Sequence, residues 1–186
     1  MTGYSYDHYK DELGNIYKFY SGTNIFAEYQ KKVDHIALGN REVNGRDAIA
    51  ECEKFLNKMG YSVGNFNLEH SNDYCYDFKA TYTFCYNDFQ TNEKLIFHLM
   101  ADDNGCVYIT DFKATDYGRF SQDEQILEKR LDLDLLKKEL EIQLNEYSGK
   151  KVSTSTVLWK NEDDVIGLRT TVFTENNTEI IYTYAK

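Results

Sequence analysis

The sequence contains no proline and no low-complexity tract, so it shows no sign of a long flexible or polyproline linker. It also lacks any run approaching the roughly 18 consecutive apolar residues that a membrane-spanning helix needs. The N-terminus, MTGYSYDHYK, lacks the apolar core of a signal peptide. The sequence as written therefore predicts a soluble chain with no membrane span.

Positive charge is scarce. The chain has 21 Lys and Arg against 31 Asp and Glu, which gives a formal net charge of −10. A surface of this sign repels the phosphates of nucleic acids instead of recruiting them. We therefore expect no direct binding of nucleic acid, and the charge favours a protein partner with a basic surface.

Cysteines are also few. The four of them form no C-x-x-C pair and are too sparse for a disulfide scaffold, so they are predicted to be small buried hydrophobic residues. If Cys75 and Cys85 lie on one strand, they are about 33 Å apart at roughly 3.3 Å per residue, which is beyond disulfide reach. Cys52 or Cys106 could still pair with one of them.

Motifs of catalysis and of nucleotide or metal binding are missing. The chain has no G-x-S-x-G, no G-x-G-x-x-G and no phosphate loop. None of the histidines, His8, His35, His70 and His98, has a second ligand at a familiar metal-binding spacing. His98 lies in an apolar strand segment, which favours a hydrogen-bonded structural role, and the pair Glu69–His70 falls in a predicted loop without a positioned nucleophile. We expect no enzyme activity, no cofactor and no metal.

What the sequence does have is tyrosine, concentrated in YCYDFKATYTFCYN at 74–87. In an extended strand one face would hold alternate residues, namely Tyr74, Tyr76, Phe78, Ala80, Tyr82, Phe84 and Tyr86. This face could be half of a hydrophobic core, a stacking platform for bases, or a protein-binding surface. The opposite face offers only Lys79 beside Asp77, which disfavours the base platform. Core packing is favoured, and protein binding stays open because tyrosine is enriched at interfaces.

The segment NGRDAIAECEKFLNKMG, 44–60, predicts an amphipathic helix, capped by Asn44 and ended by Gly60. Its apolar residues at helical spacing are Ala48, Ile49, Cys52, Phe55, Leu56 and Met59. The aromatic strand, KLIFHLMA and CVYITDFKA then predict an antiparallel meander, with the turn DDNG between the last two.

The same order of elements follows in the C-terminal part. DLDLLKKELEIQLNEYSG predicts a helix with Asp134 as cap and Gly149 as stop, whose apolar stripe is Leu133, Leu136, Leu140, Leu144 and Tyr147. KVSTSTVLWK, VIGLRTTVFT and TEIIYTYA predict three strands. The two parts share order and little residue identity, so no sequence repeat is inferred.

The predicted fold class is α+β, with two helix-plus-antiparallel-meander units of αβββ order preceded by an N-terminal β-hairpin. YSYDHYKDELGNIYKFYSG predicts two strands around the turn ELGN, and NIFAEYQKKV predicts a short helix or a strand. The predicted parts are the hairpin and connector at 1–43, the first unit at 44–118, a linker at 119–132 and the second unit at 133–186.

The segments AIAECEKFLNKMGY, GCVYITDFKATDYGRF and LLKKELEIQLNEYSG carry a family resemblance. By order of elements over 44–186, the chain resembles the cystatin-like and PepSY-type propeptide domains of Gram-positive cell-envelope proteins. The resemblance implies a non-catalytic module that binds or restrains a peptidase, or takes part in extracytoplasmic sensing. The chain departs from it by lacking an export signal and by its N-terminal hairpin. We expect an extracytoplasmic location if the sequence is an excised segment, and a cytoplasmic one if it is complete.

These observations predict a non-catalytic, acidic protein-binding module. The candidate partner-binding residues lie at hairpin tips, which project from a sheet, and are Asp102, Asp103, Glu162, Asp163 and Asp164. The alternative function is a small acidic inhibitor of a basic nucleic-acid enzyme, of the anti-CRISPR or toxin-immunity type, from a phage or mobile element. In that role an acidic surface would occupy the groove where phosphates bind.

Overall fold

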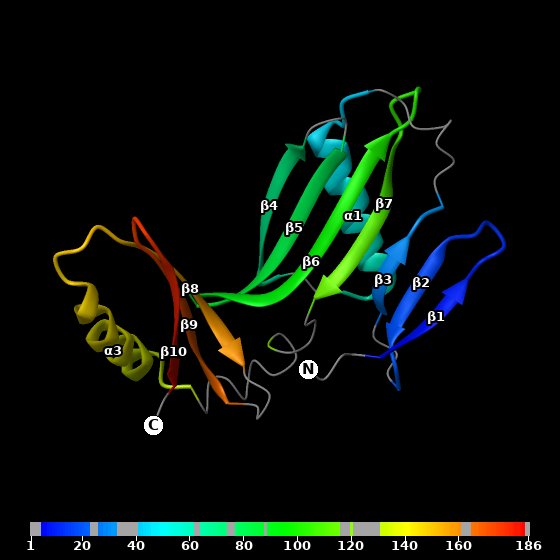
Figure 1. The fold of residues 1–186 in the computed structure, drawn as a ribbon. Helices are drawn as coiled ribbons and strands as arrows, with labels where there is room; N and C mark the ends of the chain where they lie inside the picture. The colour runs from blue at the N-terminus through cyan, green and yellow to red at the C-terminus, as the bar shows by residue number, and fades with distance from the viewer. Residues whose placement is uncertain are drawn as a thin grey trace. The chain divides into compact units, whose positions relative to one another are not determined.

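The computed structural model describes residues 5–22, 26–32, 41–61, 64–73, 77–87, 89–115, 120, 131–160 and 165–184. Ten strands and two α-helices are formed by the described residues (Figure 1). In chain order they are β1 (Tyr6–Lys10), β2 (Ile16–Tyr20), β3 (Phe26–Gln30), α1 (Gly45–Met59), β4 (Phe66–Asp73), β5 (Asp77–Tyr86), β6 (Phe89–Ala101), β7 (Val107–Thr115), α3 (Leu133–Leu144), β8 (Ser153–Lys160), β9 (Ile166–Phe173) and β10 (Thr178–Tyr184).

The predicted α+β fold of two αβββ units is wrong. The ten strands belong to one mixed sheet with the hydrogen-bonded order β1-β2-β3-β7-β6-β8-β9-β10, to which β5 is joined through β6 and β4 through β5. The N-terminal hairpin β1–β2 is present, but it is part of this sheet and does not precede it as a separate element. The fold is therefore mostly strand.

Two strands explain why the prediction failed. The ambiguous segment at β3 is a strand, and it pairs with β7, so that Glu28 lies opposite Lys113 and the hairpin joins the sheet. The 13-residue β6 pairs with β7 along most of its length, while Gln90 and Thr91 at its start pair in parallel with β8. Residue alternation identifies a strand but does not specify its partner, which depends on segments far away in the sequence.

The chain divides into two compact units, each of which takes in a part of β5 and β6. Unit 1 consists of Met1–Thr83 and Glu93–Tyr117, and unit 2 of Phe84–Asn92 and Gly118–Lys186. The predicted domain boundaries concern segments that would fold independently, and they stay predictions.

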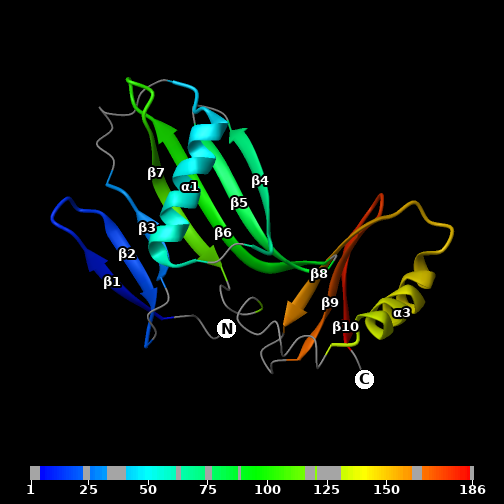
Figure 2. The same ribbon diagram turned by 180° about the vertical axis from the view of Figure 1, so that it is seen from behind.

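In unit 1, α1 packs on one face of the sheet (Figure 2). The predicted helix and both of its ends are confirmed: the Oδ1 atom of Asn44 accepts the Arg46 N–H at 3.0 Å, and Gly60 ends the helix with φ of 78°. A left-handed φ of this kind favours glycine. Cys52 and Leu56 are buried against the sheet.

The core of unit 1 is aromatic. Its rings make a continuous network in which the Phe97 and Phe112 centroids lie 4.7 Å apart and those of Phe55 and Phe112 5.0 Å apart. The alternating face of β5 is buried from Phe78 to Tyr86, of which Phe78 to Tyr82 belong to this core, and this confirms core packing for the described part of the aromatic stretch. Tyr74 and Tyr76 lie outside the described residues.

In unit 2, the cap of α3 lies two residues earlier than predicted. Asp132 caps the helix, because its Oδ1 accepts the Leu135 N–H at 3.0 Å, and Asp134 lies within the first turn. The prediction of Asp134 as the cap is therefore wrong. The helix is followed by a 3₁₀ turn, Asn145–Tyr147, and Gly149 has the left-handed φ of 80° expected of a stop.

The face of β8, β9 and β10 that meets α3 is aliphatic and threonine-rich. Leu158, Leu168 and Val172 are fully buried there, as is Thr170, and Thr183 is nearly so. The Thr183 hydroxyl donates to Gln143 Oε1 of α3 at 2.5 Å, which ties the helix to β10. Figure 2 shows α3 along the β10 side of these strands.

Candidate functional site

The turn between β6 and β7 carries two of the predicted partner-binding residues. Asp102 Oδ1 accepts the N–H groups of Asn104 and Cys106, each at 2.9 Å, and Gly105 has φ of 83°. The predicted tight hairpin turn is confirmed. The Asp102 carboxylate stabilises the turn, whereas Asp103 is exposed and available to a partner.

This turn also has a negative potential. Burial raises the pKa of the Tyr108 hydroxyl, and the charges of Asp102 and Asp103 raise it further. The Lys31 ammonium lies 4.2 Å from the centre of the Tyr108 ring. The other predicted partner-binding residues, Glu162, Asp163 and Asp164, lie outside the described residues.

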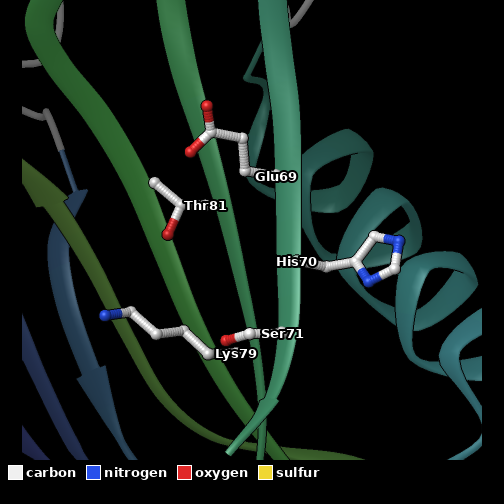
Figure 3. Close-up of a pocket in the computed structure, with 5 residues that line it drawn as sticks. All are labelled: Glu69, His70, Ser71, Lys79 and Thr81. Carbon is white, nitrogen blue, oxygen red and sulfur yellow. The ribbon is translucent and has the colours of Figure 1, made fainter.

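A shallow depression of about 240 Å³ lies between β4 and β5, lined by Glu69, His70, Ser71, Lys79 and Thr81 (Figure 3). The predicted loop at Glu69–His70 is wrong, because both residues belong to β4. The His70 ring points to the α1 side, where it stacks on Phe78 with centroids 5.5 Å apart, and the other four side chains point away from it. The depression thus does not bring the Ser71 hydroxyl and the His70 imidazole together.

His98 lies on the face of unit 1 opposite α1. Its Nδ1 is 2.9 Å from Asp77 Oδ2, and Asp111 of β7 is its cross-strand neighbour. The predicted hydrogen-bonded histidine is confirmed. Burial raises the pKa of the Asp111 carboxyl, and the nearby Glu28 charge adds to the effect, while His98 and Lys113 oppose it. No nucleophilic side chain of the described residues is hydrogen-bonded to the His98 ring, so the arrangement stabilises the sheet without assembling a catalytic dyad.

The thiols differ widely in exposure. Cys52 is fully buried, and burial, with smaller contributions from Glu53 and Glu51, raises its pKa to about 12. Cys85 is half-buried, and Cys106 is exposed, so the prediction that the cysteines are buried is wrong for Cys106. Cys75 lies outside the described residues.

The described residues form neither a metal site nor a membrane-spanning helix. In the part of the chain that the structure describes, no group of three or more His, Cys, Asp and Glu side chains is arranged to hold a metal ion. Across those same residues, no helix combines the length and apolar character needed to cross a membrane.

The face of β8, β9 and β10 that points away from α3, called here the open face of unit 2, is the most unusual surface. Cross-strand pairing places Val157, Arg169 and Tyr182 in one row and Trp159, Gly167 and Tyr184 in the next. Alternation along the strands then defines its members as Ser153, Ser155, Val157, Trp159, Gly167, Arg169, Thr171, Phe173, Thr178, Ile180, Tyr182 and Tyr184.

Aromatic rings organise this face. Trp159 and Tyr182 lie 6.1 Å apart with their planes inclined by 60°, and Tyr182 and Tyr184 are parallel at 6.5 Å. The Arg169 guanidinium lies 5.8 Å from the Trp159 ring centre, and its buried Nε has no hydrogen-bond partner among the described residues. A Cβ at Gly167 would come within 2.6 Å of the Tyr184 ring, so glycine lets that ring lie against the strand.

The open face of unit 2 is exposed and carries no acid. Phe173, Ile180 and Tyr182 are 45%, 47% and 44% exposed, although they are large and apolar. Arg169 is the only charged residue among the twelve, in a protein whose formal net charge is −10. The sequence predicted these three strands but not which of their faces α3 covers. The available signal was the alternation of aromatic and aliphatic residues along the strands.

Comparison with known proteins gives a structural likeness but no match in sequence. No family model and no curated protein matches the sequence. The chain is similar to the Bacillus megaterium YpeB C-terminal domain, with a TM-score of 0.45 and 13% identity over 96% of this chain and 76% of that one. Values this low do not define a family, so the function has to be argued from the chain's own surfaces.

Proposed function

We propose that this protein is a non-catalytic module that binds another protein through the open face of unit 2. The observation that carries the proposal is the exposure of Phe173, Ile180 and Tyr182 on one sheet face. Contiguous exposed apolar side chains are uncommon on soluble proteins and mark interaction sites. Tyr, Trp and Arg, which this face combines, are also the residues that contribute most to binding at protein interfaces.

The geometry favours a protein partner over a nucleic acid. A platform for bases needs cations that follow a phosphate backbone, and the open face of unit 2 provides only Arg169. Its aliphatic members, Val157 and Ile180, suit apolar side chains of a partner, while Ser and Thr at one end of the strands form a polar rim.

The acidic turn residues have a separate role in this proposal. Asp103, together with Glu162, Asp163 and Asp164, attracts a basic partner during the encounter, because opposite charges attract over distances comparable to the screening length. Asp102 contributes charge but is held by the turn it stabilises. Docking itself depends on the open face of unit 2.

Restraint or sensing of a peptidase at the cell envelope is the finer role that the family resemblance implies, and peptidases are the first partner class to test. Inhibition of a basic nucleic-acid enzyme is the second candidate, favoured by the net charge of −10. The two differ in a direct assay, because each enzyme can be measured with and without the purified chain.

The proposal is tested by cross-linked capture from the source cell with matched variants. Phe173→Ser combined with Tyr182→Ser should lose the captured protein, because both exposed rings of the docking surface are removed. Tyr9→Ser is the control, since Tyr9 is 59% exposed on β1 and belongs to unit 1. Equal capture by all three proteins would reject this face as the docking surface.

Binding kinetics with the captured partner then test the acidic turns. Reversing Glu162, Asp163 and Asp164 to Lys should slow association by about tenfold or more, since steering by charge changes on-rates by one to three orders of magnitude. The association rate should also fall as salt is raised above about 0.15 M, where the screening length is near 8 Å. An association rate independent of both changes would exclude electrostatic steering.

A further inference from the structure

The three edge strands of the sheet differ in how they discourage pairing with another chain. Natural edge strands commonly carry charged side chains, proline or bulges, because an unprotected edge offers its backbone groups to a further strand. In β1 the charged residues Asp7 and Lys10 fulfil this role, and in β4 Glu69 does. β10 has no lysine, arginine or proline in its seven residues.

β10 is also regular. It pairs with β9 over all seven residues without a bulge, from Thr178 opposite Phe173 to Tyr184 opposite Gly167. Its one charge, Glu179, lies near the start of the strand and accepts hydrogen bonds from the Tyr147 hydroxyl and from Asn177 Nδ2, the latter at 3.2 Å. The rest of the strand is uncharged and carries the exposed Ile180 and Tyr182.

We propose that β10 is a self-association edge, and that its occupant is β10 of a second copy of this chain, paired antiparallel about a two-fold axis. This inference does not depend on the proposed function. It would continue the sheet from one copy into the next, with the two open faces of unit 2 on the same side.

The sequence of β10 is self-complementary in this arrangement. With the axis at Ile181, Ile180 of each copy lies opposite Tyr182 of the other, so each strand's two exposed apolar residues cover those of its partner. Pairs of an aliphatic and an aromatic residue across antiparallel strands are favourable. Glu179 lies opposite Thr183 of the second copy, so no like charges face each other.

The charge of the chain sets the salt dependence. Each copy carries a formal charge of −10, so association opposes a general repulsion that salt screens. Self-association should therefore strengthen as salt rises. This is the opposite of the salt dependence expected for a basic partner, which distinguishes the two kinds of contact.

Sedimentation equilibrium of the full chain, at several concentrations and at low and high salt, tests the proposal. The wild-type protein should form a dimer whose fraction grows with concentration. Ile180→Lys should raise the dissociation constant by at least about tenfold, because it places a charge on the edge. Tyr9→Lys, on the β1 edge of unit 1, is the matched control and should leave the dimer unchanged.

Two further measurements separate edge pairing from other contacts. Phe173→Lys changes an equally exposed residue of β9, one strand in from the edge, and should leave the dimer intact. The peptide NTEIIYTY, which spans 177–184, should compete with dimer formation, whereas the same residues in scrambled order should not. A chain that is monomeric throughout, or a dimer that Ile180→Lys does not weaken, would overturn the proposal. Loss of the dimer with Phe173→Lys would also overturn it, since this would indicate packing face to face.

Discussion

The strands of unit 1 direct their large aromatic side chains toward α1, whereas β8, β9 and β10 of unit 2 direct theirs away from α3. Phe97 and Phe112 are fully buried under α1. On the strands beside α3, the helix-facing positions hold aliphatic residues and threonine, while Trp159 and Tyr182 lie on the opposite face. Large aromatic residues therefore face the helix in β6 and β7 and face away from it in β8 to β10.

The sheet faces that point away from α1 and from α3 also differ between the two units. In unit 1 this face carries polar contacts, such as the ion pair of Lys18 with Glu28 at 2.6 Å and the hydrogen bond between His98 and Asp77 at 2.9 Å. Such a face is suited to water, as expected for an antiparallel sheet covered on one side. In unit 2 the corresponding face combines exposed Phe173, Ile180 and Tyr182 with serine and threonine, and its single charged residue is Arg169. Contiguous exposed apolar side chains on a sheet face indicate a binding surface.

The largest expected effect tests whether the aromatic residues are core residues in unit 1 and surface residues on β8 to β10. Phe112→Ala should lower the free energy of unfolding by about 3 to 5 kcal/mol, as large-to-small core changes do. Tyr182→Ala should lower it by less than about 0.5 kcal/mol, because Tyr182 is a surface residue. Urea titrations measure both, and similar losses from the two variants would show that the aromatic residues of both units have the same role.

The second prediction concerns the interiors. On the face toward α3, β8 to β10 bury Thr170 and Thr183, whereas β6 and β7 bury Phe97 and Phe112 toward α1, so β8 to β10 have less apolar surface to stabilise them. In native-state hydrogen exchange, the amides of β8 to β10 should exchange at least about tenfold faster than those of β5 to β7, a difference of about 1.4 kcal/mol. Equal protection of both sets would mean that the two units open together.

The third prediction uses the two helix caps. Asn44→Ala and Asp132→Ala should each lower the free energy of unfolding by about 1 kcal/mol, because each removes a side-chain acceptor for the N–H groups of the first helical turn. The loss of stability should appear as faster hydrogen exchange in unit 1 for Asn44→Ala and in unit 2 for Asp132→Ala. Asp134→Ala is the control for the corrected cap and should cost less than about 0.5 kcal/mol. A larger loss from Asp134 than from Asp132 would reverse the assignment.

The smallest effect concerns Asp111, on the face of unit 1 that points away from α1. Its pKa is raised on folding, so the ionised carboxylate is less favourable in the folded chain than in the unfolded one. Asp111→Asn should therefore increase stability at neutral pH, by under about 0.5 kcal/mol because solvent screens a half-exposed group. The gain should vanish as the pH falls below the unfolded value of 3.8, where the carboxyl is protonated in both states. Thermal unfolding of both proteins across this range measures the gain.

Local features were predictable because they depend on neighbouring residues. The α1 helix and its caps followed from apolar spacing and from the residues Asn44 and Gly60, and the turn at Asp102 followed from its composition. The cap of α3 was missed because Asp132 and Asp134 are equally suitable in sequence, and packing decided between them. The exposure of Cys106 was missed because it sits at the end of a turn and not within the strand that follows.

The sequence by itself determined where most helices and strands form, because the 3.6-residue and two-residue periods are set by backbone geometry. It also determined the excess of negative charge. Only the tertiary structure decided that β3 joins β7, that β6 reaches β8, and that the helix covers the aliphatic face of β8 to β10. Those outcomes depend on contacts between segments far apart in the chain, and the alternation of residues along a strand is the same whichever of its two faces is covered.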